Sequence, residues 1–240
     1  MSELTNAERF IDAFNRIERI LRSRASEKAR RLTFPELVNE SKSVTTPEKT
    51  KLRDMGVLRN AIVHNPRDVD GELIADPRLS AVEWLENRAD LIENPPTVFG
   101  SLRMSSPKVL TEDDGIEAFL TEVGLPLNYS QSPVRLDKGE FGLVTTNSLA
   151  RWVAANYDPN DGLLLEKSKI SEIIPFGEEG DRVVVKSRNF KVVDAIRLFS
   201  GENGVAPGAI LLTQDGKSDQ TPIGLCVEAD IPALYRALGL

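Results

Sequence analysis

A pair of consecutive prolines divides this chain into two parts with different sequence patterns. Asn94-Pro95-Pro96 would end any helix, because proline lacks a backbone N–H and disfavours helical geometry in the residue before it. Before this point apolar residues recur at helical spacing, and after it short strand-like runs alternate with helical ones. The sequence therefore predicts an α+β protein with two domains: a helical domain at 1–95, a linker at 96–103 and a mixed domain at 104–240.

Three apolar stripes predict the main helices of residues 1–95. Thr46-Pro47-Glu48 is typical of a helix start, and Pro66 would stop the helix that follows. A further short helix is expected near Pro35–Lys42. We therefore expect a small α-helical bundle of three or four helices. The stripes consist of Phe10, Phe14, Ile17 and Leu21, then Leu52, Met55, Leu58 and Ile62, and finally Leu79, Val82, Leu85, Ala89 and Ile92.

Residues 104–240 contain a weak internal repeat. The order strand, helix, strand, strand, helix (βαββα) is expected twice, at about 104–157 and 170–240. The predicted strands include 140–146, 182–186, 208–213 and 221–227, the last two flanking a polar turn and so forming a hairpin. The predicted helices are 113–122, 148–156, 191–199 and 231–238.

Each copy of the repeat contains a glycine, two apolar residues, a position for a hydroxyl and, three residues later, a position for an acid. The first copy reads Gly142-Leu-Val-Thr-Thr-Asn-Ser148, and the second reads Gly224-Leu-Cys-Val-Glu-Ala-Asp230. Each follows a predicted strand and opens a helix. On these residues the repeat resembles a tandem pair of CBS domains over about 104–240.

The resemblance implies a regulatory site for an adenosine nucleotide (AMP, ADP or ATP) or a related adenosyl ligand. Its expected binding residues are Gly142, Thr145, Ser148, Gly224 and Asp230. Glycine lets the backbone approach a ligand, a hydroxyl beside helix N-terminal amides suits phosphate, and a carboxylate can accept ribose hydroxyls. The first copy has the hydroxyl, on Thr145, but no acid, and the second has the acid, Asp230, but no hydroxyl. One composite site built from Thr145 and Asp230 is therefore an alternative. Another alternative is a structural pair of modules that only drives dimerisation.

The only histidine of the chain follows an arginine by five residues. Arg59-Asn-Ala-Ile-Val-His64 lies at the end of the second apolar stripe. It resembles the Arg–(four residues)–His motif of HEPN domains, which are helical bundles of about this length. The resemblance implies a HEPN-like, metal-independent endoribonuclease that acts on RNA as a homodimer, in the manner of toxin–antitoxin or phage-defence proteins, with an antitoxin as a further partner.

The residue types suit RNA cleavage without a cofactor. Histidine carries protons near neutral pH, so His64 would be the general acid and base. Arg59 would stabilise the negative charge that develops on the phosphorane. Residues four apart share a helix face, so Asn60 can orient His64, whereas Arg59 lies about 140° away from it.

Other readings of the helical domain remain open. His64 could simply end a helix, where its charge is favourable, and Arg59 could pair with Asp54 or Glu83. The chain would then be a non-catalytic nucleotide-sensing adaptor with a helical dimerisation domain, or a scaffold without ligand. Residues 9–31 hold eight basic and three acidic side chains, which could track an RNA backbone or form a solvated helix face with Glu18 and Glu27 as partners.

Composition narrows the class of protein. The net charge of −7 argues against broad coating of nucleic acid. One cysteine and one histidine allow neither an intrachain disulfide nor a zinc site, so no metal is expected. No signal peptide is visible, and no apolar run approaches the roughly 20 residues that span a bilayer. We therefore expect a cytoplasmic protein without a membrane partner.

Overall fold

The computed structural model describes residues 4–64, 75–124, 129–159, 168–202 and 204–240. They form two compact units, Met1–Pro96 and Thr97–Leu240, each with its own buried core. The first unit is helical and the second holds two small sheets with helices, so the predicted α+β class is confirmed. Among the described residues, no helix is both long and apolar enough to cross a membrane.

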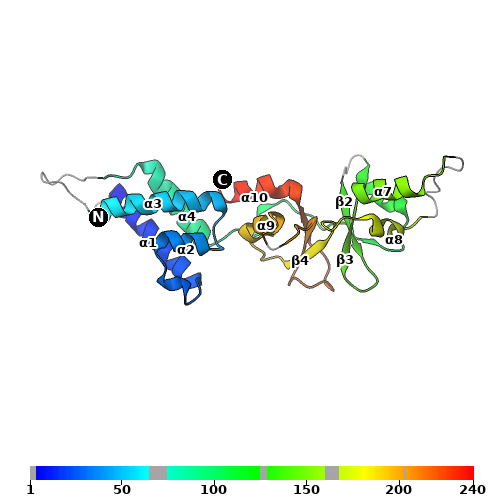
Figure 1. The fold of residues 1–240 in the computed structure, drawn as a ribbon, viewed down its shortest axis with the longest axis horizontal. Helices are drawn as coiled ribbons and strands as arrows, with labels where there is room; N and C mark the ends of the chain where they lie inside the picture. Colours follow the sequence, from blue (N-terminus) through cyan, green and yellow to red (C-terminus); the bar gives the residue numbers. More distant parts are fainter. Residues whose placement is uncertain (1–3, 65–74, 125–128, 160–167, 203) are drawn as a thin grey trace. The chain divides into compact units, whose positions relative to one another are not determined.

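In the described part of the first unit, the chain forms four α-helices and one 3-10 turn. The α-helices are labelled in Figure 1. Their apolar residues meet in one core that contains the three predicted stripes except Leu79, which is exposed, with Met55 and Leu58 at its edge. The predicted helix stop at Asn65-Pro66 lies outside the described residues. The elements are α1 (Asn6–Arg24), η1 (Ala29–Arg31), α2 (Phe34–Glu40), α3 (Thr46–His64) and α4 (Leu79–Glu93).

Local signals fix where α1 and α2 begin. Thr5 and Thr33 precede these helices, and Glu8 and Glu36 each bond back to the threonine three residues earlier, which completes a capping box. These bonds satisfy backbone amides that have no partner within the helix.

A buried ion pair joins α3 to α4. Glu48 and Arg88 are in direct contact, and both side chains are 3% exposed. The Glu48 carboxylate also accepts a hydrogen bond of 2.6 Å from the Thr45 hydroxyl. Burial of the guanidinium lowers the pKa of Arg88 from its usual value, and the neighbouring Glu48 opposes that shift. Glu48, which the sequence predicts as the acidic residue at the start of a helix, therefore also joins α3 to α4.

The second unit contains two copies of a βαββα arrangement. In each copy the first strand pairs in parallel with the second, which pairs antiparallel with the third. The first copy comprises β1 (Leu110–Thr111), α6 (Ile116–Val123), β2 (Gln131–Arg135), β3 (Phe141–Thr145) and α7 (Thr146–Asn156). The second comprises β4 (Val183–Ser187), α9 (Val192–Phe199), β5 (Ala209–Thr213), β6 (Gly224–Val227), η4 (Glu228–Asp230) and α10 (Ile231–Ala237).

Short helices precede each copy. The segment expected as a linker, 96–103, includes α5 (Val98–Ser101), whose Val98 is fully buried in the core with α9 and α10. Before the second copy come α8 (Ile170–Ile173) and η3 (Ile174–Phe176), which pack on the core of the first copy. Of these short helices, α5 leads the chain into Leu102–Lys108, which lines the site described next.

Candidate functional site

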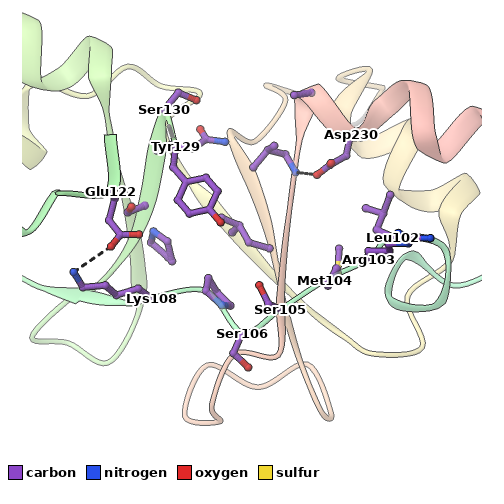
Figure 2. Close-up of a pocket in the computed structure, with 17 residues that line it drawn as sticks. Leu102, Arg103, Met104, Ser105, Ser106, Lys108, Glu122, Tyr129, Ser130 and Asp230 are labelled. Atoms are coloured by element: carbon purple, nitrogen blue, oxygen red, sulfur yellow. Dashed lines mark hydrogen bonds and ion pairs between the residues drawn. The ribbon is translucent and has the colours of Figure 1, made fainter. Parts of the chain in front are cut away.

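A cavity of about 450 Å³ lies within the second unit. Three segments that are distant in the sequence line it: Leu102–Lys108 before β1, Tyr129–Pro133 at the start of β2, and the residues from Leu225 to Asp230 that face it at the end of β6. Figure 2 shows Glu122 and Lys108 on one side, Asp230 on the other, and the Tyr129 ring extending between them. The cavity is therefore formed jointly by the two copies of the repeat.

Asp230 is held in a fixed orientation at the cavity wall. Its Oδ2 accepts a hydrogen bond of 2.9 Å from the backbone N–H of Val227, at the point where β6 passes into η4. This contact follows from the three-residue spacing of the motif, because an acid at this position can cap the amide that the strand end leaves free. A carboxylate so placed can accept hydrogen bonds from a ligand's hydroxyl groups.

A second carboxylate faces the cavity from α6. Glu122 is only 6% exposed, and its Oε1 lies 3.1 Å from Nζ of Lys108, which is about half-exposed. Arg103 is an exposed cation at the same cavity. Among the described residues that line the cavity, two side chains are basic and two are acidic, so their formal charges balance.

Gly224 shapes the cavity without lining it. A Cβ atom at this position would come 2.5 Å from Sδ of Met104, which does line the cavity. The glycine of the second copy therefore allows the segment before β1 to pass close to β6.

The polar residues of the first copy lie elsewhere. The backbone N–H of Ser148 donates to Oγ1 of Thr145 (3.0 Å), and Ser148 Oγ accepts from the Thr145 backbone N–H (2.9 Å). Both side chains are buried at the start of α7. Oγ1 of Thr145 also donates to Oδ2 of Asp181 at 3.2 Å. Gly142, in β3, packs on the side chain of Leu136.

Of the five expected ligand residues, Asp230 alone lines this cavity. The structure does not bring Thr145 and Asp230 together there, because the acid that Thr145 meets is Asp181. The sequence pattern did not single out Glu122, Lys108 or Tyr129. The motif covers only the third strand of each copy, whereas these residues come from α6 and from segments before β1 and β2.

The Arg–His motif of the first unit lies on α3. Asn60 and His64 are both exposed, whereas Arg59 is half-buried, with its guanidinium carbon 6.0 Å from the centre of the Phe14 ring. Nη1 of Arg59 donates to Oδ1 of Asn60 at 3.3 Å. Its Nε is buried and has no hydrogen-bond partner among the described residues.

The basic stretch of α1 is largely engaged within the first unit. Arg9 pairs with Glu86, Arg16 with Asp90 and Glu93, and Arg22 with Glu18, the last as expected for a helix face. Arg24 donates to the backbone carbonyl of Ile92 at 2.7 Å. The contacts of Arg9, Arg16 and Arg24 attach α1 to α4, so part of the local positive charge is engaged within the first unit.

In the described part of the chain, no group of three or more histidine, cysteine, aspartate or glutamate side chains could hold a metal ion.

No family model and no curated protein sequence matches this chain. Solved structures of CBS domains are similar to it. The CBS domain of a membrane protein from Sphaerobacter thermophilus is 18% identical, with 65% of this chain and 98% of that chain covered and a TM-score of 0.45. CBSX2 of Arabidopsis thaliana in complex with AMP is 13% identical, with coverage of 60% and 98% and a TM-score of 0.40. The CBS domain of a bacterial CNNM/CorC family Mg²⁺ transporter in complex with ATP is 13% identical, with coverage of 65% and 95% and a TM-score of 0.42.

Proposed function

We propose that the second unit is a sensor that binds an adenosine nucleotide or related adenosyl ligand in the cavity between Lys108 and Asp230. The orientation of Asp230 carries this proposal. One carboxylate oxygen is held by the Val227 amide, so the group is fixed before a ligand arrives and can accept the two neighbouring ribose hydroxyls. The apolar walls, which include Leu102, Met104 and the Tyr129 ring, suit a purine base.

The charge of the cavity favours a ligand with little negative charge. Arg103 offers a cation to one phosphate, whereas Lys108 is already paired with the buried Glu122. A chain of three phosphates would meet the uncompensated carboxylate of Asp230 with few cations to balance it. We therefore expect AMP or a nucleoside-like ligand to bind more tightly than ATP.

Calorimetry on the full chain with adenosine, AMP, ADP and ATP tests this function. We expect AMP binding, and a loss of at least about tenfold in affinity for Asp230→Ala, since a hydrogen bond to a charged group contributes about 1.5–3 kcal/mol. Asp219→Ala is the matched control, because Asp219 is exposed in the turn between β5 and β6 and does not line the cavity. Absence of heat with all four ligands would reject a sensor of this class.

For the first unit we propose a HEPN-type endoribonuclease that acts as a homodimer under control of this ligand, as in toxin or defence proteins. The exposure of Asn60 and His64 on one helix face favours it, together with a guanidinium that bonds to Asn60 while its Nε has no partner among the described residues. His64 would move protons to and from the ribose oxygens, Arg59 would stabilise the phosphorane, and Asn60 would orient one of them.

Cleavage of RNA in the presence of EDTA tests this second proposal. We compare the wild type with His64→Ala and Arg59→Ala, with and without AMP. Arg53→Ala is the control, because Arg53 lies on the same helix and bonds only to Thr50 in the described structure. Cleavage that disappears in the two motif variants alone supports the enzyme. Equal cleavage by all variants, or none by the wild type, leaves the non-catalytic nucleotide-sensing adaptor.

A further inference from the structure

The strands of the two repeats are paired in matching register. Each segment that lines the cavity therefore corresponds to a segment at the equivalent place in the other repeat. Gly142 lies opposite Val134, which lies opposite Leu110, and Gly224, Leu212 and Lys186 are paired in the same way. Counting from these pairs, Ser105 corresponds to Asp181, Ser130 to Gly208, and Val227 to Thr145. The second unit therefore has two related positions, and the cavity occupies one of them.

At the second of these positions, the segments that correspond to the cavity lining are in direct contact, and we call this the closed position. The backbone N–H of Gly208 donates to the carbonyl of Gly180 at 2.6 Å, and that of Ala209 donates to the carbonyl of Arg182 at 3.4 Å. In the open cavity the residues that correspond to Gly208 and Gly180 are Ser130 and Met104, and both line the space. The same pair of segments is thus separated at one position and hydrogen-bonded at the other.

Glycine makes this close approach feasible. A Cβ atom on Gly208 would come 2.7 Å from Cδ2 of Leu143 and 3.0 Å from the carbonyl oxygen of Gly180. At the open position Ser130 carries the side chain that Gly208 lacks. The two copies therefore carry different residues, Gly208 and Ser130, at the place where one position is closed and the other is open.

Asp181 occupies the polar centre of the closed position. Its Oδ2 accepts hydrogen bonds from the Thr145 hydroxyl (3.2 Å) and from the backbone N–H of Glu178 (3.0 Å). The hydroxyl that would suit a ligand phosphate is thus bonded to an internal carboxylate, whose negative charge repels phosphate. At the open position the corresponding residues are Ser105 and Val227, which bring no charge.

We propose that the segment Glu178–Arg182, held by Asp181, fills the second position, so that the unit takes one ligand per chain and takes it at the Asp230 side. This inference rests on the proposed sensor function for its stoichiometry, but the internal closure can be tested without any ligand. The first test below can therefore reject the closure, and the second can reject the stoichiometry, independently of each other.

The first test is a double-mutant cycle on the full chain without ligand, read by thermal unfolding. Asp181→Ser and Thr145→Val should each lower the midpoint of the second unit by about 3 °C, and the double variant should lose clearly less than the sum because the two groups share one bond. Ser105→Ala, at the corresponding place in the open cavity, should leave the midpoint unchanged. Additive losses in the double variant would overturn the closure by Asp181.

The second test is the stoichiometry of AMP binding by calorimetry on the full chain. We expect one AMP per chain in the wild type and in Asp181→Asn, and an affinity at least about tenfold lower in Asp230→Ala. Two AMP molecules per chain, or loss of binding in Asp181→Asn, would overturn the inference while leaving the sensor function in place. Absence of binding would reject the sensor function and with it the stoichiometry, and the closure would then be decided by the cycle alone.

Discussion

At the scale of single residues, the chemistry of Cys226 depends on where β6 places it. Burial raises the pKa of its thiol to about 12, and the negative charge and hydrogen bond of Asp230 act in the same direction. Because the thiolate is the reactive form, we expect this buried cysteine to be inert in the folded protein. The same neighbour, Asp230, also lines the cavity.

We therefore predict that the native chain at pH 8 does not react with a thiol reagent such as Ellman's reagent, and that unfolding exposes one reactive thiol per chain. Asp230→Ala should remain unreactive, because burial is the larger cause of the raised pKa. The release of thionitrobenzoate with and without guanidinium measures both states. Rapid labelling of the native wild type would contradict the burial of Cys226.

At the scale of elements, the pair Glu48–Arg88 fixes the contact between α3 and α4. Removing one partner of a buried pair leaves an uncompensated charge, so we predict that Glu48→Ala lowers the free energy of unfolding by about 3–5 kcal/mol. Glu40→Ala, an exposed acid at the end of α2, should change it by less than about 0.5 kcal/mol. Urea denaturation measures both values.

A double substitution separates charge from packing at this site. Replacing both partners with apolar residues, as in Glu48→Met with Arg88→Leu, should restore much of the lost stability, since no buried charge is then left alone. A double variant as unstable as Glu48→Ala would show that the loss arises from packing or from the hydrogen bonds to Thr45.

The contact between α1 and α4 should depend on pH. The hydrogen bond from Arg9 lowers the pKa of Glu86, so its contribution to stability is complete above the unfolded value of about 4.3 and is lost as the pH falls through the folded value. We predict that Glu86→Gln is less stable than the wild type at pH 7, by less than about 1 kcal/mol because the pair is partly exposed. The difference should shrink as the pH falls below about 4.3 and the Glu86 carboxylate takes up a proton. Urea titrations at pH 7 and at a series of lower pH values measure it, and a difference that stays constant would contradict this account.

Helix positions could be predicted from the sequence because their signals are local. The apolar stripe from Phe10 to Leu21 and the turn-forming prolines act within a few residues. The partner of Glu48 could not be found in this way, since Arg88 lies 40 residues further along and no spacing rule connects them. The site shows the same limit: the Asp230 motif is local, whereas Glu122 and Lys108 face it only after the two repeats pack together.

At the scale of the whole molecule, each unit has a core of its own. Among the residues that the structure describes, one apolar cluster lies in Met1–Pro96 and two clusters, one for each repeat, lie in Thr97–Leu240. All residues that line the proposed ligand cavity belong to the second unit. A ligand there stabilises the folded form of that unit by an amount that its concentration and dissociation constant determine.

We predict that AMP at about 100 times its dissociation constant stabilises the second unit by about 2.7 kcal/mol, which corresponds to a rise in its unfolding midpoint of about 5–10 °C. The variants assign the thermal transitions: Glu48→Ala lowers that of the helical unit, and the Asp181 and Thr145 variants lower that of the second unit. Differential scanning calorimetry of the full chain measures both. Because Asp230 supplies the fixed acceptor in the proposed site, a loss of at least about tenfold in affinity should reduce the stabilisation of Asp230→Ala at the same AMP concentration to about 1.4 kcal/mol or less, while Asp219→Ala behaves as the wild type. A shift in Asp230→Ala as large as that of the wild type would place the ligand outside this cavity.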